Sequence, residues 1–264
     1  MRPLFPAAGA LCAVLALFSL PAARAASADG GVRAGPAARL EQLRGLSPAA
    51  LAEQLRLTPA DELVLLGREG VRQLGTYRAR LIKQERVGGR LRPAQTLEII
   101  VQPAPRALRL EYLEGPKAGR KVLWKADRPR QILVREAGIL GLASLWLDVD
   151  GGLAHGDTNH DVTDLGFAPL LDLIERDLRK AAPLGGHRRH DEGFDGAGNY
   201  CLTFTAPAGA AGLYAARTRL CIDPRLAVPV QIDVEDGAGL LERYHYTQIR
   251  GKQTIDPLLL TEIQ

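Results

Sequence analysis

This sequence lacks the short motifs that mark the large enzyme classes. It has no G-x-S-x-G motif of serine hydrolases, no Walker A loop, no Rossmann glycine pattern and no HExxH zinc motif. Serine is scarce too: after residue 46 there are only Ser47, which precedes a proline, and Ser144, which lies in an apolar stretch. These absences exclude the standard nucleophile, nucleotide and zinc motifs. They favour a protein that has no catalytic residue and needs no cofactor.

Long apolar runs are confined to the N-terminus. An apolar stretch follows Arg2 over residues 7–20, and then come Pro21 and Ala23-Arg24-Ala25, which fits the A-x-A cleavage pattern. The stretch is shorter than the roughly 20 residues that a membrane-spanning helix needs. We therefore predict a signal peptide over residues 1–25, cleaved near Ala25, and export to the periplasm.

A strong excess of charge of one sign is also missing. The formal net charge is +4, and loss of Arg2 and Arg24 with the signal peptide leaves +2. The basic residues are interleaved with acidic ones, so the sequence gives no support for nucleic-acid binding. Removal of 25 of the 264 residues leaves 239, which is enough for one β-rich domain.

Cysteine is rare. Beyond Cys12 in the predicted signal peptide, the chain contains only Cys201 and Cys221. An even pair in an exported protein favours a disulfide. Both cysteines lie in strand-like stretches joined by a turn centred near Ala211, and such a hairpin would place them opposite each other. Two buried free thiols are the alternative.

Helical signals precede the strands. Residues 26–46 are rich in Ala, Gly and Arg without apolar periodicity, which indicates a flexible leader. Ser47-Pro48 and Thr58-Pro59 each place a capping residue before a proline and predict two helix starts. Thr58 and Asp61 match a capping box. The second helix is predicted to end near Leu74-Gly75.

From Thr76 onward the apolar period changes from 3.6 residues to 2, which indicates strands. The predicted strands cover 76–87, 95–102, 106–113, 120–126, 130–136, 139–148, 199–206, 213–223, 227–235 and 240–249. An amphipathic helix with an apolar stripe interrupts them near residues 164–182. We predict an α+β fold, mainly antiparallel β: a single domain over residues 47–264, with a strongly curved open sheet and helices packed on its concave side.

Four stretches of this sequence resemble a known family. They are TYRARLIKQERVGG, LEYLEGPKAGRKVLW, NHDVTDLGF and CIDPRLAVPVQIDVEDGAGLLERYHYTQI. Together they are similar to an uncharacterised family of exported bacterial proteins in the periplasmic lipoprotein-carrier (Lol-type) half-barrel superfamily, over about residues 70–255. The resemblance implies a half-barrel closed by helices and a hydrophobic ligand held between sheet and helices. It carries over no catalytic residues.

Two polar segments, 149–164 and 185–198, combine histidines with carboxylates. The first contains His155, Asp157, His160, Asp161 and Asp164, and the second contains His187, His190, Asp191 and Glu192. Neither segment has the spacing of a known metal site. We interpret both as solvated loops without a metal, and we expect Asp164 or Thr163 to cap the helix that follows.

Apolar residues are the better candidates for a binding site. Residues 138–147, GILGLASLWL, form the most apolar stretch after the signal peptide. We predict that this stretch and the stripe of the helix line a concave apolar pocket. The predicted lining residues are Trp124, Leu145, Trp146, Phe167, Leu171 and Ile174.

One predicted strand carries an unusual run of charge, Lys83-Gln84-Glu85-Arg86. If the odd positions face the core, as Tyr77 and Leu81 indicate, then Lys83 and Glu85 also lie on the core face. Charges there need a partner. We predict that these two residues lie at the mouth of the apolar cleft.

These observations favour a monomeric, non-enzymatic carrier or sensor of the envelope that holds a lipid, an acyl chain or a lipoprotein. The alternative is an envelope hydrolase that uses carboxylates or histidines of segments 149–164 and 185–198. A third hypothesis is a scaffold that pairs with another envelope protein through an edge of the sheet.

Overall fold

The computed structural model describes residues 34–263 apart from 139–142, 153–157 and 211. Within these residues, twelve strands form one antiparallel sheet in the order β7-β6-β5-β4-β3-β1-β12-β11-β10-β9-β8, with β2 paired to β1. The predicted signal peptide lies outside the described residues. Among the helices that the structure describes, none is long and apolar enough to cross a membrane.

The described elements follow one another in this order. The helices α1 (Pro36–Arg44), α2 (Pro48–Leu57) and α3 (Ala60–Leu74) come first. They are followed by the strands β1 (Tyr77–Val87), β2 (Arg90–Leu91), β3 (Gln95–Pro103), β4 (Arg106–Glu114), β5 (Lys121–Lys125), β6 (Gln131–Arg135) and β7 (Leu145–Asp148). The turn η2 (Val162–Asp164) precedes the helix α5 (Phe167–Ala181), which continues into η3 (Ala182–Leu184). The last elements are β8 (Arg188–Phe194), β9 (Tyr200–Thr205), β10 (Arg217–Asp223), β11 (Val228–Asp236), β12 (Gly239–Arg250) and η4 (Pro257–Leu260).

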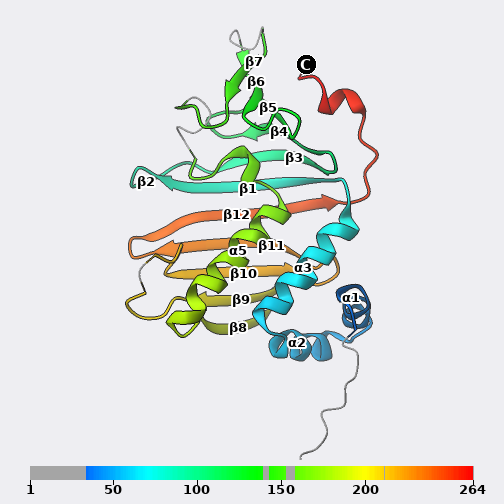
Figure 1. Cartoon of the computed structure of the whole chain (residues 1–264), viewed down its shortest axis with the longest axis vertical. Coiled ribbons are helices and arrows are strands. Elements are labelled where there is room, and N and C mark those ends of the chain that lie inside the picture. The colour runs from blue at the N-terminus through cyan, green and yellow to red at the C-terminus, as the bar shows by residue number, and fades with distance from the viewer. Residues whose placement is uncertain (1–33, 139–142, 153–157, 211, 264) are drawn as a thin grey trace, which may run out of the picture. The chain divides into compact units, whose positions relative to one another are not determined.

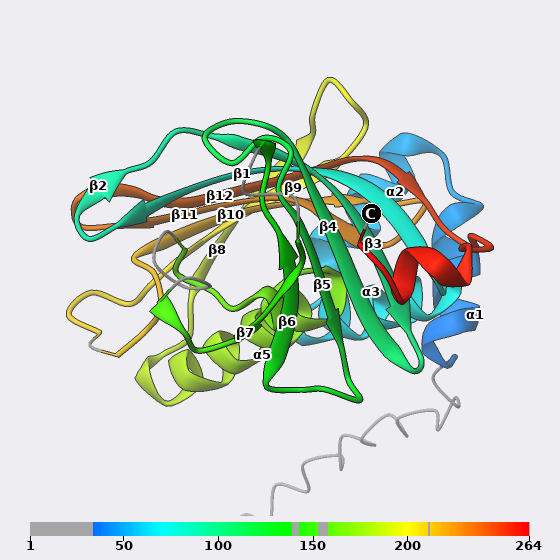
Figure 2. The same ribbon diagram turned by 90° about the horizontal axis from the view of Figure 1, so that it is seen from above.

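The sheet is open and strongly curved. Strands β7 and β8 form its two ends, and Figure 2 shows the strands β4–β7 bending around the space that α3 and α5 occupy. In Figure 1 these two helices run side by side across β8–β12. The predicted fold, a curved open sheet with helices on its concave side, is confirmed.

The main core lies between the concave face and the helices. Alternate strand residues such as Leu81, Ile99 and Leu110 are almost completely buried there, as the period of 2 predicts. A smaller cluster lies on the convex face, where Leu123 and Leu133 pack under the C-terminal residues 260–263.

The flexible leader predicted over residues 26–46 is wrong from Pro36 onward. Residues Pro36–Arg44 form α1, with Pro36 in the first turn, where a missing N–H costs nothing. Leu40 and Leu43 are buried, and α1 packs on α3. Two leucines are too few to produce a visible period, yet their contact with α3 holds the helix in place.

The predicted helix boundaries are largely confirmed. Ser47 caps α2, since its Oγ accepts a hydrogen bond from the Ala50 N–H at 3.4 Å. Gly75 ends α3 with a φ of 59°, a conformation that favours glycine. The capping box of Thr58 and Asp61 is wrong, because the Thr58 hydroxyl instead donates to the Gln54 carbonyl oxygen at 2.7 Å, at the end of α2.

The strand predictions hold except at the two edges of the sheet and at the start of β10. Strand β8 lies in the segment 185–198 that we interpreted as a loop, so that interpretation is wrong. As an edge strand it begins with the polar residues RRHDE and has no alternating apolar residues, so the apolar period does not reveal it. The predicted strand 139–148 is formed over Leu145–Asp148, and residues 139–142 lie outside the described residues. Strand β10 begins at Arg217, four residues later than predicted.

The predicted disulfide is present. Cys201 on β9 lies directly opposite Cys221 on β10, and the two form a disulfide with a Cα–Cα distance of 4.0 Å. Both residues are buried in the core.

Candidate functional site

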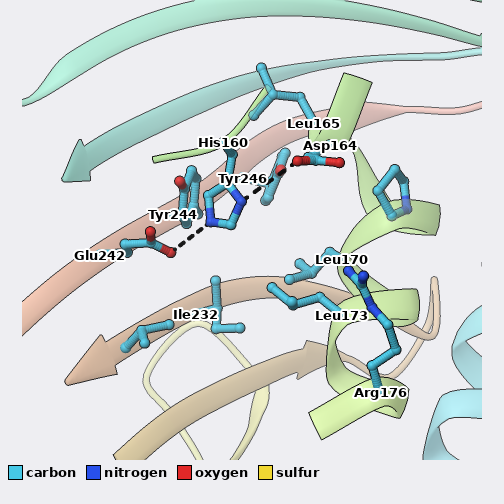
Figure 3. A pocket seen from close by; sticks show the side chains of 12 residues that line it. His160, Asp164, Leu165, Leu170, Leu173, Arg176, Ile232, Glu242, Tyr244 and Tyr246 are labelled. Atoms are coloured by element: carbon cyan, nitrogen blue, oxygen red, sulfur yellow. Dashed lines mark hydrogen bonds and ion pairs between the residues drawn. The ribbon is translucent and has the colours of Figure 1, made fainter. Parts of the chain in front are cut away.

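A narrow apolar cleft separates α5 from the strands β10–β12. Leu173 of α5 faces Ile232 and Val234 of β11 in the middle of the cleft, where its two adjoining pockets meet. Figure 3 shows Leu170 and Leu173 reaching from the helix toward Ile232. The two pockets enclose only about 50 and 40 Å³.

The apolar stripe of α5 is not fully covered. Phe167 and Leu171 are buried, but Leu170, Leu173, Ile174 and Leu178 are only half-buried although they lie along the cleft or against the core. Because α5 is narrower than the curved sheet beneath it, apolar side chains of the helix and of the sheet face each other across the cleft without filling it.

His160 closes one end of the cleft. Its Nε2 lies 3.0 Å from Oε2 of Glu242 on β12 and 2.9 Å from the Tyr214 hydroxyl. Its Nδ1 lies 3.8 Å from a carboxylate oxygen of Asp164, so the imidazole stands between two acids (Figure 3). Three segments distant in the sequence meet at this ring.

These contacts set the charge of the group. Burial opposes protonation of His160, but the hydrogen bonds to Asp164 and Glu242 outweigh it and raise the histidine pKa to about 10. Burial works against ionisation of Glu242 as well, but the bond to His160 holds its pKa below the usual value. At neutral pH the pair is therefore ionic, a protonated histidine and a carboxylate.

Lys83 and Glu85 form a second buried ion pair next to this group. The Lys83 Nζ lies 3.1 Å from Glu85 Oε2, and the Tyr244 hydroxyl donates to the other carboxylate oxygen of Glu85. Thr158 accepts from Lys83 and donates to Glu85, at 3.2 and 3.1 Å. Both residues lie on the core face, as their strand positions predict. They line another pocket, together with Arg92 and Gln95, and are not among the residues that line the two pockets of the cleft.

His187 stands at the other end of the cleft. Its Nε2 lies 2.9 Å from Oδ2 of Asp177 on α5, whose other oxygen accepts the Tyr214 backbone N–H at 3.1 Å. The imidazole is 6 % exposed. Its Nδ1 has no hydrogen-bonding partner among the described residues.

The predicted lining residues fall into three groups. Leu171 and Ile174 line a pocket between α5, α3 and the sheet, and Ile174 also borders the cleft. Phe167 is fully buried and stacks on Tyr77, with ring centroids 4.9 Å apart. Trp124 lies in the core, and its Nε1 donates to the Pro129 carbonyl oxygen at 3.1 Å.

The prediction that Trp146 lines the cleft is wrong, whereas Leu145 pairs with Val134 of the main core and so lies on the concave side, outside the two pockets of the cleft. Both lie on the edge strand β7 and are exposed, Trp146 by 44 %. Trp146 pairs with Leu133, whose side chain packs on the convex face. Its position in the strand therefore directs it away from the cleft, and the Arg128 guanidinium covers its ring.

In the described parts of segments 149–164 and 185–198, most histidines and carboxylates bind other residues of the chain. His155 and Asp157 lie outside the described residues. His190 is exposed on β8, while Asp191 and Glu192 pair with Arg189 and Arg219. Neither Thr163 nor Asp164 caps α5, because both belong to η2 and Gly166 occupies the capping position.

The described residues contain one group of three potential metal ligands close enough to share an ion. It consists of Asp195, Cys201 and Cys221. The two sulfur atoms are bonded to each other in the disulfide, so they offer no thiolate to a metal.

Sequence reasoning missed Glu242, Tyr214 and the role of His187. Glu242 shares the core-facing register of Tyr244 and Tyr246 on β12. The same alternation that identified Lys83 and Glu85 therefore also marks Glu242. The contacts of His160 and His187 join distant segments, and no local pattern indicates them.

This fold and cleft define an open half-barrel protein with an apolar cleft under its second long helix. The chain belongs to the family described as "Protein of unknown function (DUF1571)", whose model matches residues 74–259. No curated protein matches the sequence.

Several solved structures are similar to the chain. An uncharacterized conserved protein from Thermus thermophilus matches with a TM-score of 0.45 and 11% identity, covering 78% of this chain and 94% of that chain. The lipoprotein LppX from Mycobacterium tuberculosis gives 0.42 and 14%, covering 80% and 100%. A LolA superfamily protein from Nitrosomonas europaea gives 0.35 and 10%, covering 76% and 97%. At these scores and identities the similarity carries no statement about a ligand.

Proposed function

We propose that this protein is an exported, non-enzymatic carrier or sensor that binds a lipid or another acyl chain between α5 and the sheet. The observation that carries the proposal is the half-buried apolar stripe of α5 facing Ile232 and Val234 across a cleft. Burial of this apolar surface by a ligand chain removes it from water and stabilises the complex.

Binding requires α5 to move. The enclosed space, about 50 Å³ in the pocket next to His160, holds only a few water molecules and no acyl chain. Arg68 of α3 ties α5 to its neighbour through Asp172 and Glu175, at 2.7 Å each. These groups are partly exposed and such ion pairs are weak, so the two ion pairs oppose a movement of α5 only slightly.

The direct test is native mass spectrometry of protein purified from the periplasm, combined with organic extraction. The proposal predicts a co-purifying molecule with a long alkyl chain. A clean preparation that also fails to bind a fluorescent acyl probe would contradict it.

A charge in the middle of the cleft should abolish binding. We expect Leu173→Asp to weaken binding of the acyl probe about tenfold or more, because an acyl chain would have to bury the new carboxylate. Trp146→Asp is the matched control: it adds the same charge on the convex face and should leave the affinity unchanged. Circular dichroism and the melting temperature report whether both variants fold. Equal affinities of the two variants for the probe would show that the ligand does not bind next to α5.

We also propose that the mature protein begins after Ala25 and acts as a periplasmic monomer, with a lipidated protein or another envelope protein as a further partner. N-terminal sequencing of the exported protein and sedimentation of the purified chain test the first two statements.

A hydrolase is the second candidate, because two histidine–carboxylate pairs, His160–Glu242 and His187–Asp177, border the cleft. A histidine held by a carboxylate, as in the His187–Asp177 pair, can serve as a general base. His160 is protonated at neutral pH and could act only as an acid. Turnover of a long-chain p-nitrophenyl ester that is lost in His187→Gln would favour it over the carrier.

A further inference from the structure

His187 is the one polar side chain of the cleft that combines near-complete burial with a ring nitrogen left without a partner in the described chain. It lies just before β8, and its imidazole is only 6 % exposed. Its Nε2 bonds to Asp177 at 2.9 Å, while Nδ1 has no partner among the described residues. A buried polar atom without a hydrogen bond costs free energy, so this nitrogen is a candidate contact for a bound molecule.

The surroundings of His187 are apolar. Leu173, Leu178, Phe204 and Leu220 line the same pocket. Asp177 and Tyr214 are already engaged, since both oxygens of Asp177 accept hydrogen bonds and the Tyr214 hydroxyl bonds to His160. The remaining polar lining residue is Thr218, a hydroxyl without charge. A ligand that places its chain against these leucines therefore brings its polar group to His187.

The bond to Asp177 fixes how the ring can act. A carboxylate oxygen accepts, so the hydrogen of the neutral ring lies on Nε2 and Nδ1 carries a lone pair. The neutral ring accepts a hydrogen bond from a protonated carboxyl group, and the protonated ring donates to a carboxylate. In both states exactly one proton lies between Nδ1 and a carboxyl oxygen.

We propose that His187 is the anchor for a long-chain carboxylic acid whose alkyl chain lies between α5 and β9–β11. This inference rests on the proposed function and adds the chemical class of the ligand. His160 is a poorer anchor because both of its ring nitrogens face acids, and Arg176 is exposed to water.

The test compares oleic acid with its methyl ester, each displacing a neutral fluorescent apolar probe from the full mature protein. His187→Gln is the informative variant, since the glutamine amide N–H can retain the bond to Asp177 while Nδ1 is lost. We expect wild type to prefer the acid. In His187→Gln, affinity for the acid should fall about tenfold, the value of one hydrogen bond, while affinity for the ester stays unchanged.

Two further variants test whether Nδ1 of His187, and not another group, binds the acid. His187→Asn places an amide near the position of Nδ1 and gives up the bond to Asp177, so it should keep part of the preference for the acid even if it is less stable. Arg176→Gln should leave the preference intact. Loss of the preference in Arg176→Gln but not in His187→Gln would overturn the proposal.

The outcomes separate the two claims. Equal binding of acid and ester to wild type, or an unchanged ratio in His187→Gln, would overturn the anchor and leave the apolar cleft standing. If neither compound displaces the probe from wild type, the proposed function fails as well.

Discussion

At the scale of single residues, the molecule buries an unusual amount of charge beside its apolar cleft. Glu242 is 1 % exposed, and Lys83 and Glu85 are nearly as buried. Each has a partner of opposite charge, and tyrosine hydroxyls complete the hydrogen bonding. Because such charges are tolerated only when paired, these residues fix the position of the segment before α5 on β1 and β12.

The His160 contacts predict a pH dependence of stability. Folding brings Asp164 and Glu242 to the His160 ring, and this raises the His160 pKa from 6.5 to about 10. The protonated ring therefore stabilises the folded state. The contribution of His160 to the free energy of unfolding is complete below pH about 6.5 and is lost as the pH rises toward 10. We expect the difference in melting temperature between wild type and His160→Gln to be largest at pH 6 and small at pH 9.5. His190→Gln, at an exposed position on β8, is the control. A difference that stays constant with pH would contradict this assignment.

The Lys83–Glu85 pair predicts a strong effect of removing one partner. Lys83→Met leaves the Glu85 carboxylate buried without its cation, and we expect a loss of about 3–5 kcal/mol in the free energy of unfolding. The double variant Lys83→Met with Glu85→Met removes both charges and should recover much of that loss. Denaturant titration of the single and double variants measures the coupling. A double variant as unstable as the sum of the single ones would show that the two charges do not stabilise each other.

Residue positions within strands could be predicted from the sequence, and contacts between strands could not. Alternation along β1 places Lys83 and Glu85 on the core face, where the structure has them. Their neighbours Tyr244 and Thr158 come from positions more than 70 residues away along the chain. A pairing of this kind depends on the order of strands in the sheet, which no local pattern contains.

At the scale of elements, α3 is held on the sheet by a close backbone contact. At Gly70 an added Cβ would lie 2.3 Å from the Leu226 carbonyl oxygen and 2.8 Å from that of Ala227. At Gly67, one turn earlier, the nearest atom is the flexible Leu171 side chain, at 2.8 Å. The two glycines therefore differ in what an alanine would displace.

We expect Gly70→Ala to destabilise the protein even though alanine favours a helix by about 1 kcal/mol over glycine. The turn between β10 and β11 has to move away from the helix. Gly67→Ala should be milder, because the Leu171 side chain can shift. Denaturant midpoints of the two variants decide the matter. A stabilised Gly70→Ala would show that the turn yields easily.

Two elements that sequence reasoning missed, β8 and α1, each have a physical reason for showing no apolar period. Strand β8 is an edge strand and needs no apolar alternation, because charge on an edge prevents pairing with other chains. Helix α1 has two buried leucines, Leu40 and Leu43, and depends on α3 for its stability. Strands inside the sheet were predictable because the core face imposes a period of 2 on them.

At the scale of the whole described chain, the two faces of the sheet are covered differently. The C-terminal segment covers the convex face of β3–β6, and the buried Arg109 donates to the Leu259 and Glu262 carbonyl oxygens at 3.1 Å. On the concave side α5 covers β9–β12 incompletely. The curvature that produces this gap follows from the twist and pairing of twelve strands, so the sequence could indicate an apolar pocket but not where it lies.

Photo-crosslinking with a diazirine-labelled fatty acid, followed by peptide mapping of the mature protein, shows directly where the acyl chain binds. Binding between α5 and the sheet predicts labels on α5 (Phe167–Ala181) and on the facing strands β9–β12, and competition by unlabelled oleic acid. Labels concentrated on β7 and the convex face, or labelling that oleic acid does not reduce, would contradict it.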